Sequence, residues 1–501
     1  NRGEIAVRVI RACRELGIGT VAICSEVDRH ALHAGMADLA VVVGPAEPTE
    51  SYLRADRILE VAAETDADAV HPGYGFLAEN AAFARACHEA GLVFIGPAAE
   101  VIEQMGEKTA ARAIMDKAGV PVVPGALLPE PDDGGRYPGD EVRRICEGVG
   151  YPLMVKAAFG GGGKGMRLVT DPEDVVRACE GAAREAAGAF GDGTVYVEKF
   201  IETPRHVEFQ IFGDRHGNHV HLLERECSIQ RRHQKIIEES PSPAVTPELR
   251  EEMGRAAVAA ARAVDYEGAG TVEFLLAADG AFYFLEMNTR LQVEHPVTEL
   301  VTGTDLVRAQ IRVAEGHPLP WRQDDIAARG HAIECRVYAE DPADGFLPSL
   351  GGILLMHQPE GPGVRVDSGI RQGDEVTMYY DPMIAKLSLH GEDRTAAVDR
   401  AVTALKEYAI LGVTTNVEYL ISILQHPVFA GGRLHTGFLD EHLPDWTGGS
   451  DDDDLALAMA AVDEFARLEA GPGPGIAGPP GGRPAASPWD YLGRFRLSGL
   501  D

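Results

Sequence analysis

Residues 151–169 read YPLMVKAAFGGGGKGMRLV, in which two apolar runs flank a loop containing four consecutive glycines. Two strand-like runs joined by such a loop predict a β-hairpin. Glycines lack a Cβ atom, so their backbone N–H groups can approach phosphate oxygens closely. The loop is not a Walker P-loop, because Ala158 stands where that motif needs glycine and Gly165 follows Lys164 where it needs serine or threonine. It also lies between strands rather than at the start of a helix, unlike a dinucleotide-binding loop.

Two lysines favour phosphate binding at this loop. Lys156 ends the strand before the loop, and Lys108 lies upstream. An ammonium group is a compact positive charge that suits phosphate. The alternatives are a hairpin tip without a ligand and two solvated surface lysines.

A pair of carboxylates marks a second candidate site. Glu273 and Glu286 each lie in an apolar run, and these runs are predicted to pair as antiparallel strands, with Asn288 just behind the second. An unpaired charge is costly to bury. Mg²⁺ removes that cost, because it binds one or two carboxylates together with phosphate oxygens. The alternative is a buried glutamate–arginine pair.

Residues 288–295 read NTRLQVEH, a segment crowded with charge directly after the second carboxylate run. Arg290 offers a bidentate fork for a small oxyanion such as bicarbonate or phosphate. Glu294 could then accept a proton from that anion.

Residues 230–235, QRRHQK, place further cations in a predicted loop between two elements. Loops carry function more often than cores do. His206 and His233, taken singly, fit structural roles better than catalytic ones.

The first hundred residues alternate helical and strand patterns. A helical pattern over 4–16 stops at the glycines of 17–19, and short apolar runs at 20–24, 40–43, 69–70 and 92–95 predict buried strands. This alternation predicts βαβ units and a parallel sheet. Later patterns predict strands at 207–211, 220–223, 271–275 and 282–286, an alanine-rich helix at 247–264 and a long helix near 394–408.

The composition changes after residue 444. Residues 448–454 are acidic and residues 471–484 are rich in glycine and proline, which is typical of flexible linkers. A short helical pattern at 455–469 lies between them. Trp489 and Tyr491 begin a new apolar segment, so we expect the chain to break off inside a further domain.

The chain has 501 residues and a formal net charge of −32. This acidity argues against nucleic acids and anionic membranes as partners. No apolar run approaches the ~18 residues of a spanning helix, and no signal peptide is recognised. Seven scattered cysteines without a CxxC pair predict free thiols in a reducing cytoplasm.

At the glycine loop, the carboxylate pair and the charged segments described above, the chain resembles the biotin carboxylase component of biotin-dependent carboxylases, in the ATP-grasp superfamily. The matching stretches occur in family order at 1–6, 71–77, 156–165, 198–199, 205–208, 224–235, 286–295, 330–336 and 380–386, and the resemblance covers about 1–443. It implies a mixed α/β and α+β fold. Its implied parts are a Rossmann-like domain at 1–107 that lacks its first strand, an ATP-grasp domain at 108–315 with a mobile lid at about 125–198, and a biotin carboxylase C-terminal domain at 328–443. A linker at 444–486 and the truncated start of a connecting or biotinyl region at 487–501 would follow.

The resemblance also implies roles for the matched residues. The implied ATP contacts are Lys108, Lys156, Gly162, Gly163, Glu198, Lys199, Ile201, His206, Gln230 and His233. The implied ligands of Mg²⁺ or Mn²⁺ are Glu273, Glu286 and Asn288. The residues implied to frame bicarbonate are Lys235, Arg290, Gln292 and Val293, with Glu294 as the base. Arg336 would stabilise the biotin enolate, and Tyr74 would face the biotin ring. The alternative for Arg336 is a structural ion pair with Glu334 or Glu340.

The implied reaction is the ATP-dependent carboxylation of biotin by bicarbonate through carboxyphosphate, the first half-reaction of an acyl-CoA carboxylase. The implied cofactors are ATP, Mg²⁺ or Mn²⁺, and biotin, either as a substrate or on a carrier domain that we expect to be absent from this chain. The expected partners are that carrier domain, further copies of the chain and a carboxyltransferase subunit.

Three alternatives stay open beside this interpretation. Pyruvate and urea carboxylases share the same module. A purine-pathway carboxylase of the ATP-grasp class is another candidate, against which the stretches at 224–235 and 330–336 argue. An inactive nucleotide-binding module would be favoured by the loss of a key side chain, but Lys156, Glu286, Arg290, Glu294 and Arg336 are all present.

Overall fold

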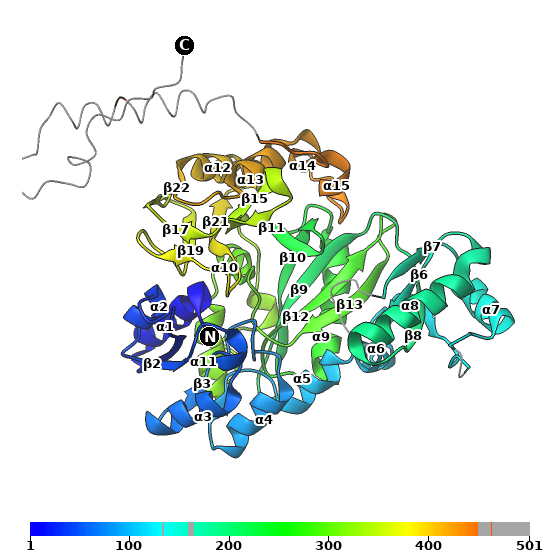
Figure 1. The fold of residues 1–501 in the computed structure, drawn as a ribbon, viewed down its shortest axis with the longest axis horizontal. Helices are drawn as coiled ribbons and strands as arrows, with labels where there is room; N and C mark the ends of the chain where they lie inside the picture. Colours follow the sequence, from blue (N-terminus) through cyan, green and yellow to red (C-terminus); the bar gives the residue numbers. More distant parts are fainter. Residues whose placement is uncertain (133–134, 159–164, 449–461, 463–501) are drawn as a thin grey trace, which may run out of the picture. The chain divides into compact units, whose positions relative to one another are not determined.

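One antiparallel sheet of eight strands organises most of the chain (Figure 1). The structure, a computed structural model, describes residues 1–132, 135–158, 165–448 and 462, and its first compact unit is Asn1–Gly448. The strands follow the order β13 (Phe282–Asn288), β12 (Gly268–Leu276), β9 (Arg205–Gly213), β10 (His219–Arg231), β11 (Gln234–Ser240), β14 (His331–Tyr338), β21 (Met383–Gly391) and β19 (Val364–Ser368). Because β11 pairs with β14, the sheet runs unbroken from the predicted central segment into the predicted C-terminal segment.

Helices pack on this sheet. The alanine-rich α9 (Pro247–Ala263) contacts β9 and β10, and its buried side chains include Met253 and Ala257. The helix α12 (Arg394–Glu407) packs on β14 and β21, and α13 (Val417–Gln425) packs on α12. The helix α10 (His295–Thr302) contacts the middle strands β10, β11, β14 and β21. The sheet and its helices therefore bury α10 and the segment before it.

The N-terminal part alternates helices and parallel strands, as predicted. β1 (Val21–Ser25) pairs in parallel with β2 (Leu39–Gly44), and β3 (Ala69–Val70) pairs in parallel with β4 (Val93–Phe94), in two separate sheets. The first helix, α1 (Gly3–Leu16), ends at Gly17, whose φ of 71° lies in the left-handed region that glycine adopts without strain. The other helices of this part are α2 (Leu32–Met36), α3 (Ala55–Glu64), α4 (Ala81–Glu89) and α5 (Ala99–Gly106).

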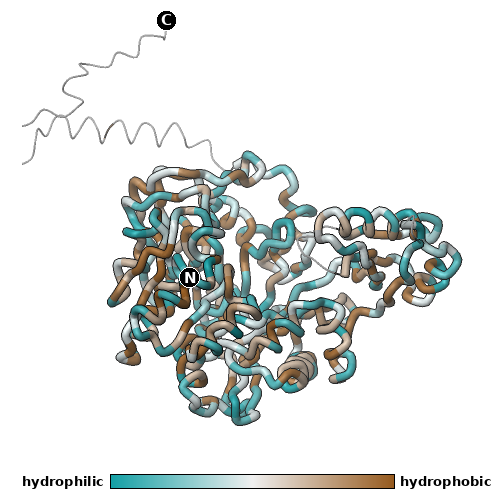
Figure 2. Tube along the Cα trace, turned by 60° about the horizontal axis from the view of Figure 1, so that its bottom comes forward, coloured by the Kyte–Doolittle hydropathy of each residue, from teal (hydrophilic) through white to brown (hydrophobic). Residues whose placement is uncertain are grey.

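A second, four-stranded sheet forms the arm on the right of Figures 1 and 2. Its order is β5 (Gly125–Leu127), β8 (Val195–Lys199), β6 (Leu153–Ala157) and β7 (Arg167–Val169), with α7 (Gly139–Val149) and α8 (Val175–Phe190) packed on it. The arm has its own buried core, which includes Val142, Leu153 and Val197. β6 and β7 are antiparallel, as the predicted hairpin requires. The hairpin tip, with Gly162 and Gly163, lies outside the described residues.

The remaining elements complete the C-terminal part and the connections. The helices are α6 (Lys108–Lys117), α11 (Leu306–Ala314), α14 (Pro427–Ala430) and α15 (Phe438–His442). The strands are β15 (Glu340–Asp341), β16 (Leu347–Pro348), β17 (Gly351–Gly352), β18 (Leu355–His357), β20 (Glu375–Val376) and β22 (Ala409–Leu411). The short 3₁₀ turns are η1 (Pro48–Glu50), η2 (Pro172–Asp174), η3 (Gln323–Asp325) and η4 (Pro342–Asp344).

Several further predictions can be compared with the structure. All seven cysteines are free thiols, as predicted, and all seven are buried. No helix in the described ranges is both long and apolar enough to cross a bilayer. The prediction of a loop at 230–235 is wrong: Gln230 pairs with Lys235 across β10 and β11, and the turn consists of Arg232 and His233 alone. The linker beyond residue 448, including the helical pattern at 455–469 apart from residue 462, and the segment 487–501 lie outside the described residues.

Candidate active site

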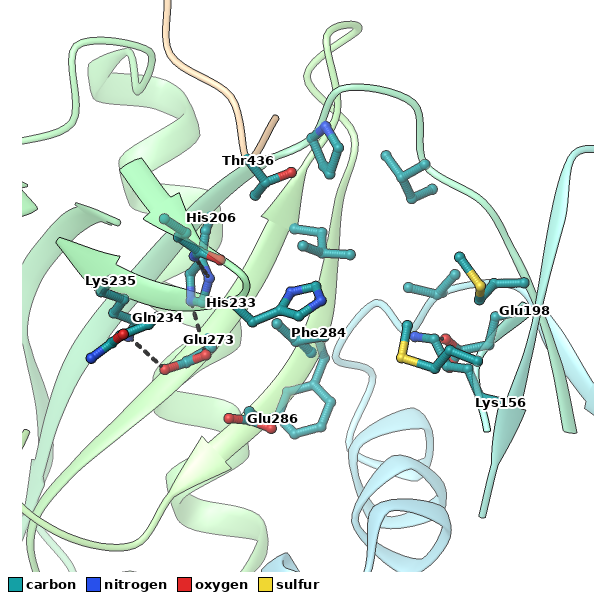
Figure 3. Close-up of a pocket in the computed structure, with 18 of the residues that line it drawn as sticks. Lys156, Glu198, His206, His233, Gln234, Lys235, Glu273, Phe284, Glu286 and Thr436 are labelled. Carbon is teal, nitrogen blue, oxygen red and sulfur yellow. Dashed lines mark hydrogen bonds and ion pairs between the residues drawn. The ribbon is translucent and has the colours of Figure 1, made fainter. Parts of the chain in front are cut away.

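A cavity of about 1090 Å³ lies between the arm, the large sheet and the C-terminal part. Its walls include nearly all described residues for which the sequence predicted a role: Lys108, Lys156, Glu198, Lys199, Ile201, His206, Gln230, His233, Lys235, Glu273, Glu286, Asn288, Arg290, Gln292, Val293, Glu294 and Arg336. Tyr74 is not among its lining residues. Figure 3 shows Lys156 and Glu198 on the arm, on the opposite side of the cavity from Glu273 and Glu286.

The register of β12 against β13 places the two predicted carboxylates side by side. Glu273 on β12 lies directly opposite Glu286 on β13. Proximity to Glu273, followed by burial, raises the pKa of Glu286 above its ordinary value. Burial alone would raise the pKa of Glu273 too, but Lys235 and His206 hold it well below its usual range. The two carboxylates therefore repel each other, and one of them resists ionisation. A divalent cation bound between them would remove this repulsion, so the pair is a suitable set of metal ligands.

Glu273 is also tied to neighbouring side chains. Its Oε2 lies 2.8 Å from His206 Nε2, and its Oε1 accepts hydrogen bonds from Lys235 Nζ, Asn288 Nδ2 and Gln292 Nε2, each at 2.9 Å. The alternative of a buried glutamate–arginine pair therefore does not describe Glu273, whose cationic neighbours are a lysine and a histidine.

Glu294 lies at the centre of the cavity's charged wall. It is 1% exposed and precedes the first residue of α10. Its Oε1 accepts a hydrogen bond from Lys235 Nζ at 2.7 Å, and its Oε2 accepts one from Arg336 Nη2 at 2.9 Å. Burial would raise the pKa of Glu294, but Lys235, Arg336 and Arg225 hold it well below its usual range. Glu294 is therefore a buried carboxylate that stays ionised, and only the ionised form can accept a proton.

Arg336 on β14 contacts two carboxylates, Glu238 on the neighbouring strand β11 and Glu294 directly before α10. Its Nε donates to Glu238 Oε1 at 2.6 Å, in addition to the contact with Glu294. The alternative partners Glu334 and Glu340 are therefore wrong, because both are engaged elsewhere. Glu340 pairs with Arg231 at 2.8 Å, and Glu334 accepts a hydrogen bond from Ser388 at 2.7 Å.

The side chain of Arg290 is held in place by Glu79, a residue of the N-terminal part. Its Nε donates to Glu79 Oε2 at 2.8 Å, and its Nη2 donates to Asn288 Oδ1 at 3.1 Å. Glu79 also accepts a hydrogen bond from the backbone N–H of Thr289 at 3.1 Å. Glu79 therefore fixes the guanidinium at the beginning of the charged segment.

The arm side of the cavity holds a smaller ionic group. Lys156 Nζ lies 2.5 Å from Glu198 Oε2, and Arg112 Nη1 lies 2.6 Å from Glu198 Oε1. On the sheet side, Gln230 Nε2 lies 2.8 Å from His206 Nδ1. Lys235 and Arg290 also line the cavity on the sheet side, opposite Lys156 and Arg112. Cationic groups therefore face the cavity from both sides, which suits a polyphosphate.

Sequence reasoning missed four side chains that hold this site together. Arg225, which is fully buried, donates to Glu208 Oε1 at 2.6 Å and to Gln292 Oε1 at 2.6 Å. Lys235 Nζ lies 2.6 Å from Glu208 Oε2. Glu208, Arg225, Glu238 and Glu79 were missed, although Glu208 and Arg225 lie inside the matching stretches 205–208 and 224–235. The available signal was a charged residue inside an apolar strand, which indicates a partner on the neighbouring strand.

Family models match most of the described chain. Residues 1–102 match the N-terminal domain of biotin carboxylase, and residues 334–441 match its C-terminal domain. Residues 107–322 match the ATP-binding domain of the carbamoyl-phosphate synthase L chain.

Named relatives agree with these models. The chain is 54% identical to a pyruvate carboxylase subunit of Methanothermobacter thermautotrophicus, over 88% of this chain and 89% of that protein. It is 52% identical to biotin carboxylase of Halalkalibacterium halodurans, over 89% of this chain and 98% of that protein. It is 47% identical to the methylcrotonoyl-CoA carboxylase α subunit of Dictyostelium discoideum, over 99% of this chain and 70% of that protein.

Solved structures show the same architecture. The biotin carboxylase domain of Hydrogenobacter thermophilus 2-oxoglutarate carboxylase, a dimer in complex with MgADP, ADP and bicarbonate, matches with a TM-score of 0.82 and 49% identity, over 90% of this chain and 98% of that chain. The β-γ-ATP complex of biotin carboxylase from Campylobacter jejuni matches with a TM-score of 0.83 and 44% identity, over 88% of this chain and 97% of that chain. The predicted mixed fold, with ATP-grasp and biotin carboxylase parts, is confirmed by these neighbours. The chain belongs to the biotin carboxylase family, within the ATP-grasp ligases.

Proposed function

We propose that this chain catalyses the ATP-dependent carboxylation of biotin by bicarbonate, with the side chains of the cavity in the roles that the sequence predicts. The observation that carries this proposal is the buried, ionised Glu294 held between Lys235 and Arg336. An arriving bicarbonate would compete with Glu294 for these cations. A carboxylate that loses cationic partners becomes a stronger base, because its pKa rises. Bicarbonate binding would thus activate the residue that deprotonates it.

The proposed reaction proceeds in two stages. Glu294 accepts the bicarbonate proton, and a bicarbonate oxygen attacks the γ-phosphorus of ATP as the bond to ADP breaks, which gives carboxyphosphate. Carboxyphosphate then breaks into CO₂ and phosphate. The phosphate removes the N1′ proton of biotin, and that nitrogen attacks CO₂ to form carboxybiotin. Lys235 and Arg290 would hold the anions of the first stage, and Arg336 the biotin enolate of the second.

The residues around Glu286 fit a divalent metal ion. We assign Glu273, Glu286 and Asn288 as ligands of Mg²⁺ or Mn²⁺, on the grounds that the two carboxylates face each other and that proximity to Glu273 raises the pKa of Glu286. When bound, the ion supplies positive charge that offsets the charge of the nucleotide phosphates.

Nucleotide contacts are proposed on both sides of the cavity. On the arm, Lys156, Glu198, Lys199 and Ile201 line the cavity, while Lys108, His206, Gln230 and His233 line it from other elements. We propose that the arm, residues 125–198, closes over ATP. Tyr74 does not line the cavity, and its contact with biotin stays a proposal.

The molecule that finally receives the carboxyl group from carboxybiotin is proposed to be an acyl-CoA. The methylcrotonoyl-CoA carboxylase α subunit of D. discoideum aligns over 99% of this chain, whereas biotin carboxylase of H. halodurans aligns over 89%. The former alignment thus extends into the segment after residue 448, where the sequence predicts a linker and the start of a further region. Against the mouse methylcrotonoyl-CoA carboxylase α subunit, this chain spans 61% of that protein. A biotinylated carrier domain, a carboxyltransferase and further copies of this chain are the proposed partners.

The test is an ATP hydrolysis assay on the full-length gene product. ADP release at the full rate should require bicarbonate, Mg²⁺ and free biotin together, with only a slower bicarbonate-dependent release without biotin, and Glu294→Gln should lose both. Hydrolysis at the full rate without biotin or bicarbonate would contradict the proposed function. Adding the co-purifying partners with labelled bicarbonate, and offering acetyl-, propionyl- and methylcrotonyl-CoA beside pyruvate, identifies the acceptor; label transferred only to pyruvate would refute an acyl-CoA.

A further inference from the structure

A buried lysine outside the predicted site contacts the backbone of residues 290–294, which are proposed to hold bicarbonate and are called the bicarbonate segment below. Lys386 on β21 is 0% exposed, and its Nζ donates to the carbonyl oxygen of Val293 at 2.6 Å. Its counter-charge is Glu4 on α1, whose Oε1 lies 3.2 Å from Nζ. Burying a lysine is costly unless its charge is paired and hydrogen-bonded, so Glu4 and the Val293 carbonyl together hold the ammonium in one place.

The carbonyl beside it is anchored as well. Gln292 O accepts hydrogen bonds from His295 Nδ1 at 2.8 Å and from His295 N at 3.3 Å. Two consecutive peptide groups, 292–293 and 293–294, are therefore held by their carbonyl oxygens. Both peptide bonds are trans, so each N–H points away from the carbonyl of its own unit. The N–H groups of Val293 and Glu294 are thus turned away from His295 and Lys386.

These two N–H groups lack partners within the described ranges of the chain: neither donates to another described residue. They come directly before α10, whose eight residues add a partial positive charge at the helix start. Successive free N–H groups of this kind bind anions. The side chains of Arg290 and Lys235, which line the same cavity, add full positive charges.

The Lys386 ammonium also lies close to two buried carboxyl groups and to an aromatic ring. Burial raises the pKa of Glu4 to about 7, and Lys386 opposes that shift. Burial also raises the pKa of Glu334 to about 7, again against Lys386. The Lys386 ammonium lies 6.0 Å from the centre of the Tyr74 ring. One ammonium group thus connects α1, the bicarbonate segment and the proposed biotin contact.

We propose that Lys386 is a positioning residue for bicarbonate: by holding the Val293 carbonyl, it aims the N–H groups of Val293 and Glu294 at the anion. This inference rests on the proposed function of the site. Without the Lys386 ammonium the 293–294 peptide can rotate, and the anion loses aligned donors. ATP binds through other residues, so its binding should not change.

The test variant is Lys386→Met, which keeps the length of the side chain and removes its charge. We expect the KM for bicarbonate to rise ~10-fold or more, which corresponds to losing about one charge-assisted hydrogen bond, while the KM for ATP stays within twofold of the wild type. The matched control is Lys406→Met, at an exposed lysine on α12, which should change neither constant. Because Lys386→Met leaves Glu4 buried without a partner, the double variant Lys386→Met/Glu4→Gln provides a neutral pair if the single variant fails to fold.

Bicarbonate binding is measured in parallel by ¹³C NMR line broadening, which needs no turnover. Weaker binding by the folded variant, with unchanged binding of ATP, supports the role of Lys386. Bicarbonate affinity equal to that of the wild type overturns it, as does an equal loss of affinity for ATP and bicarbonate. If the wild type binds bicarbonate but does not couple it to ATP cleavage, the proposed function fails, while the binding comparison still decides the role of Lys386.

Discussion

Replacing Arg336 by methionine is expected to separate the two stages of the proposed reaction. The guanidinium contacts Glu238 Oε1 at 2.5 Å and Glu294 Oε2 at 2.9 Å. Its charge is needed most when biotin becomes anionic, so losing this one stabiliser should slow carboxybiotin formation by roughly 10²–10³-fold. ATP cleavage that depends on bicarbonate but not on biotin should fall less than about 10-fold, because that stage does not develop charge at Arg336. Lys235 still holds Glu294 at 2.7 Å.

The structure also sets the expected loss of stability. Breaking a buried ion pair from one side costs about 3–5 kcal/mol when the remaining charge has no other partner. In Arg336→Met, each of the two remaining carboxyl groups, Glu238 and Glu294, has another way to avoid an unpaired charge. Burial raises the pKa of Glu238 to about 8, although Arg336 opposes the shift, so this carboxyl can take up a proton near neutral pH. Glu294 keeps Lys235, and we therefore expect a loss of only about 1–3 kcal/mol.

The assay compares both reactions in each variant. ADP release with bicarbonate but without biotin reports the first stage, carboxybiotin formation from free biotin reports the second, and urea unfolding reports stability. Arg290→Met is the matched comparison, since it should lose both reactions. Equal losses of both reactions in Arg336→Met, at any stability, would refute the enolate role and leave Arg336 as a structural ion pair.

Three further outcomes are expected from the same cavity. Glu286→Gln removes one negative charge and keeps the shape, so turnover at saturating Mg²⁺ should fall ~10²-fold or more; wild-type turnover would contradict the metal assignment. The pKa of Glu238 is raised from 4.5 to about 8, so the protonated carboxyl stabilises the fold, fully below the lower value and progressively less as the pH rises to the higher one. The free energy of unfolding of the wild type should therefore fall between pH ~4.5 and ~8 relative to Glu238→Gln, and parallel curves would argue against a raised pKa. Arg225→Met removes the guanidinium from the fully buried Glu208, which keeps Lys235 as a partner at 2.6 Å, so the free energy of unfolding should fall by about 1–3 kcal/mol; an unchanged urea midpoint would show that Lys235 alone suffices as the partner of Glu208.

Local patterns in the sequence predicted much of this protein. The alternation of helices and short apolar runs predicted a parallel sheet in the N-terminal part, where the structure has two separate parallel pairs, β1–β2 and β3–β4, and the two runs around the glycine loop predicted the pairing of β6 with β7. The facing of Glu273 and Glu286 was also within reach, because the strands that carry them are neighbours in the chain. These features depend on residues close in sequence, whose hydrophobic period is visible in the chain itself.

The partners of the charged residues were decided by the tertiary structure. Glu208 lies opposite Glu273 on one side and opposite Arg225 on the other, so one row across β12, β9 and β10 carries the charges that surround Lys235. That row depends on the order of the strands, which brings distant segments of the chain into contact. A residue pattern shows which face of a strand is buried, but it does not show which strand lies beside it. The Lys386 contact with Val293 arises in the same way, because only the folded sheet and α10 bring the two segments together.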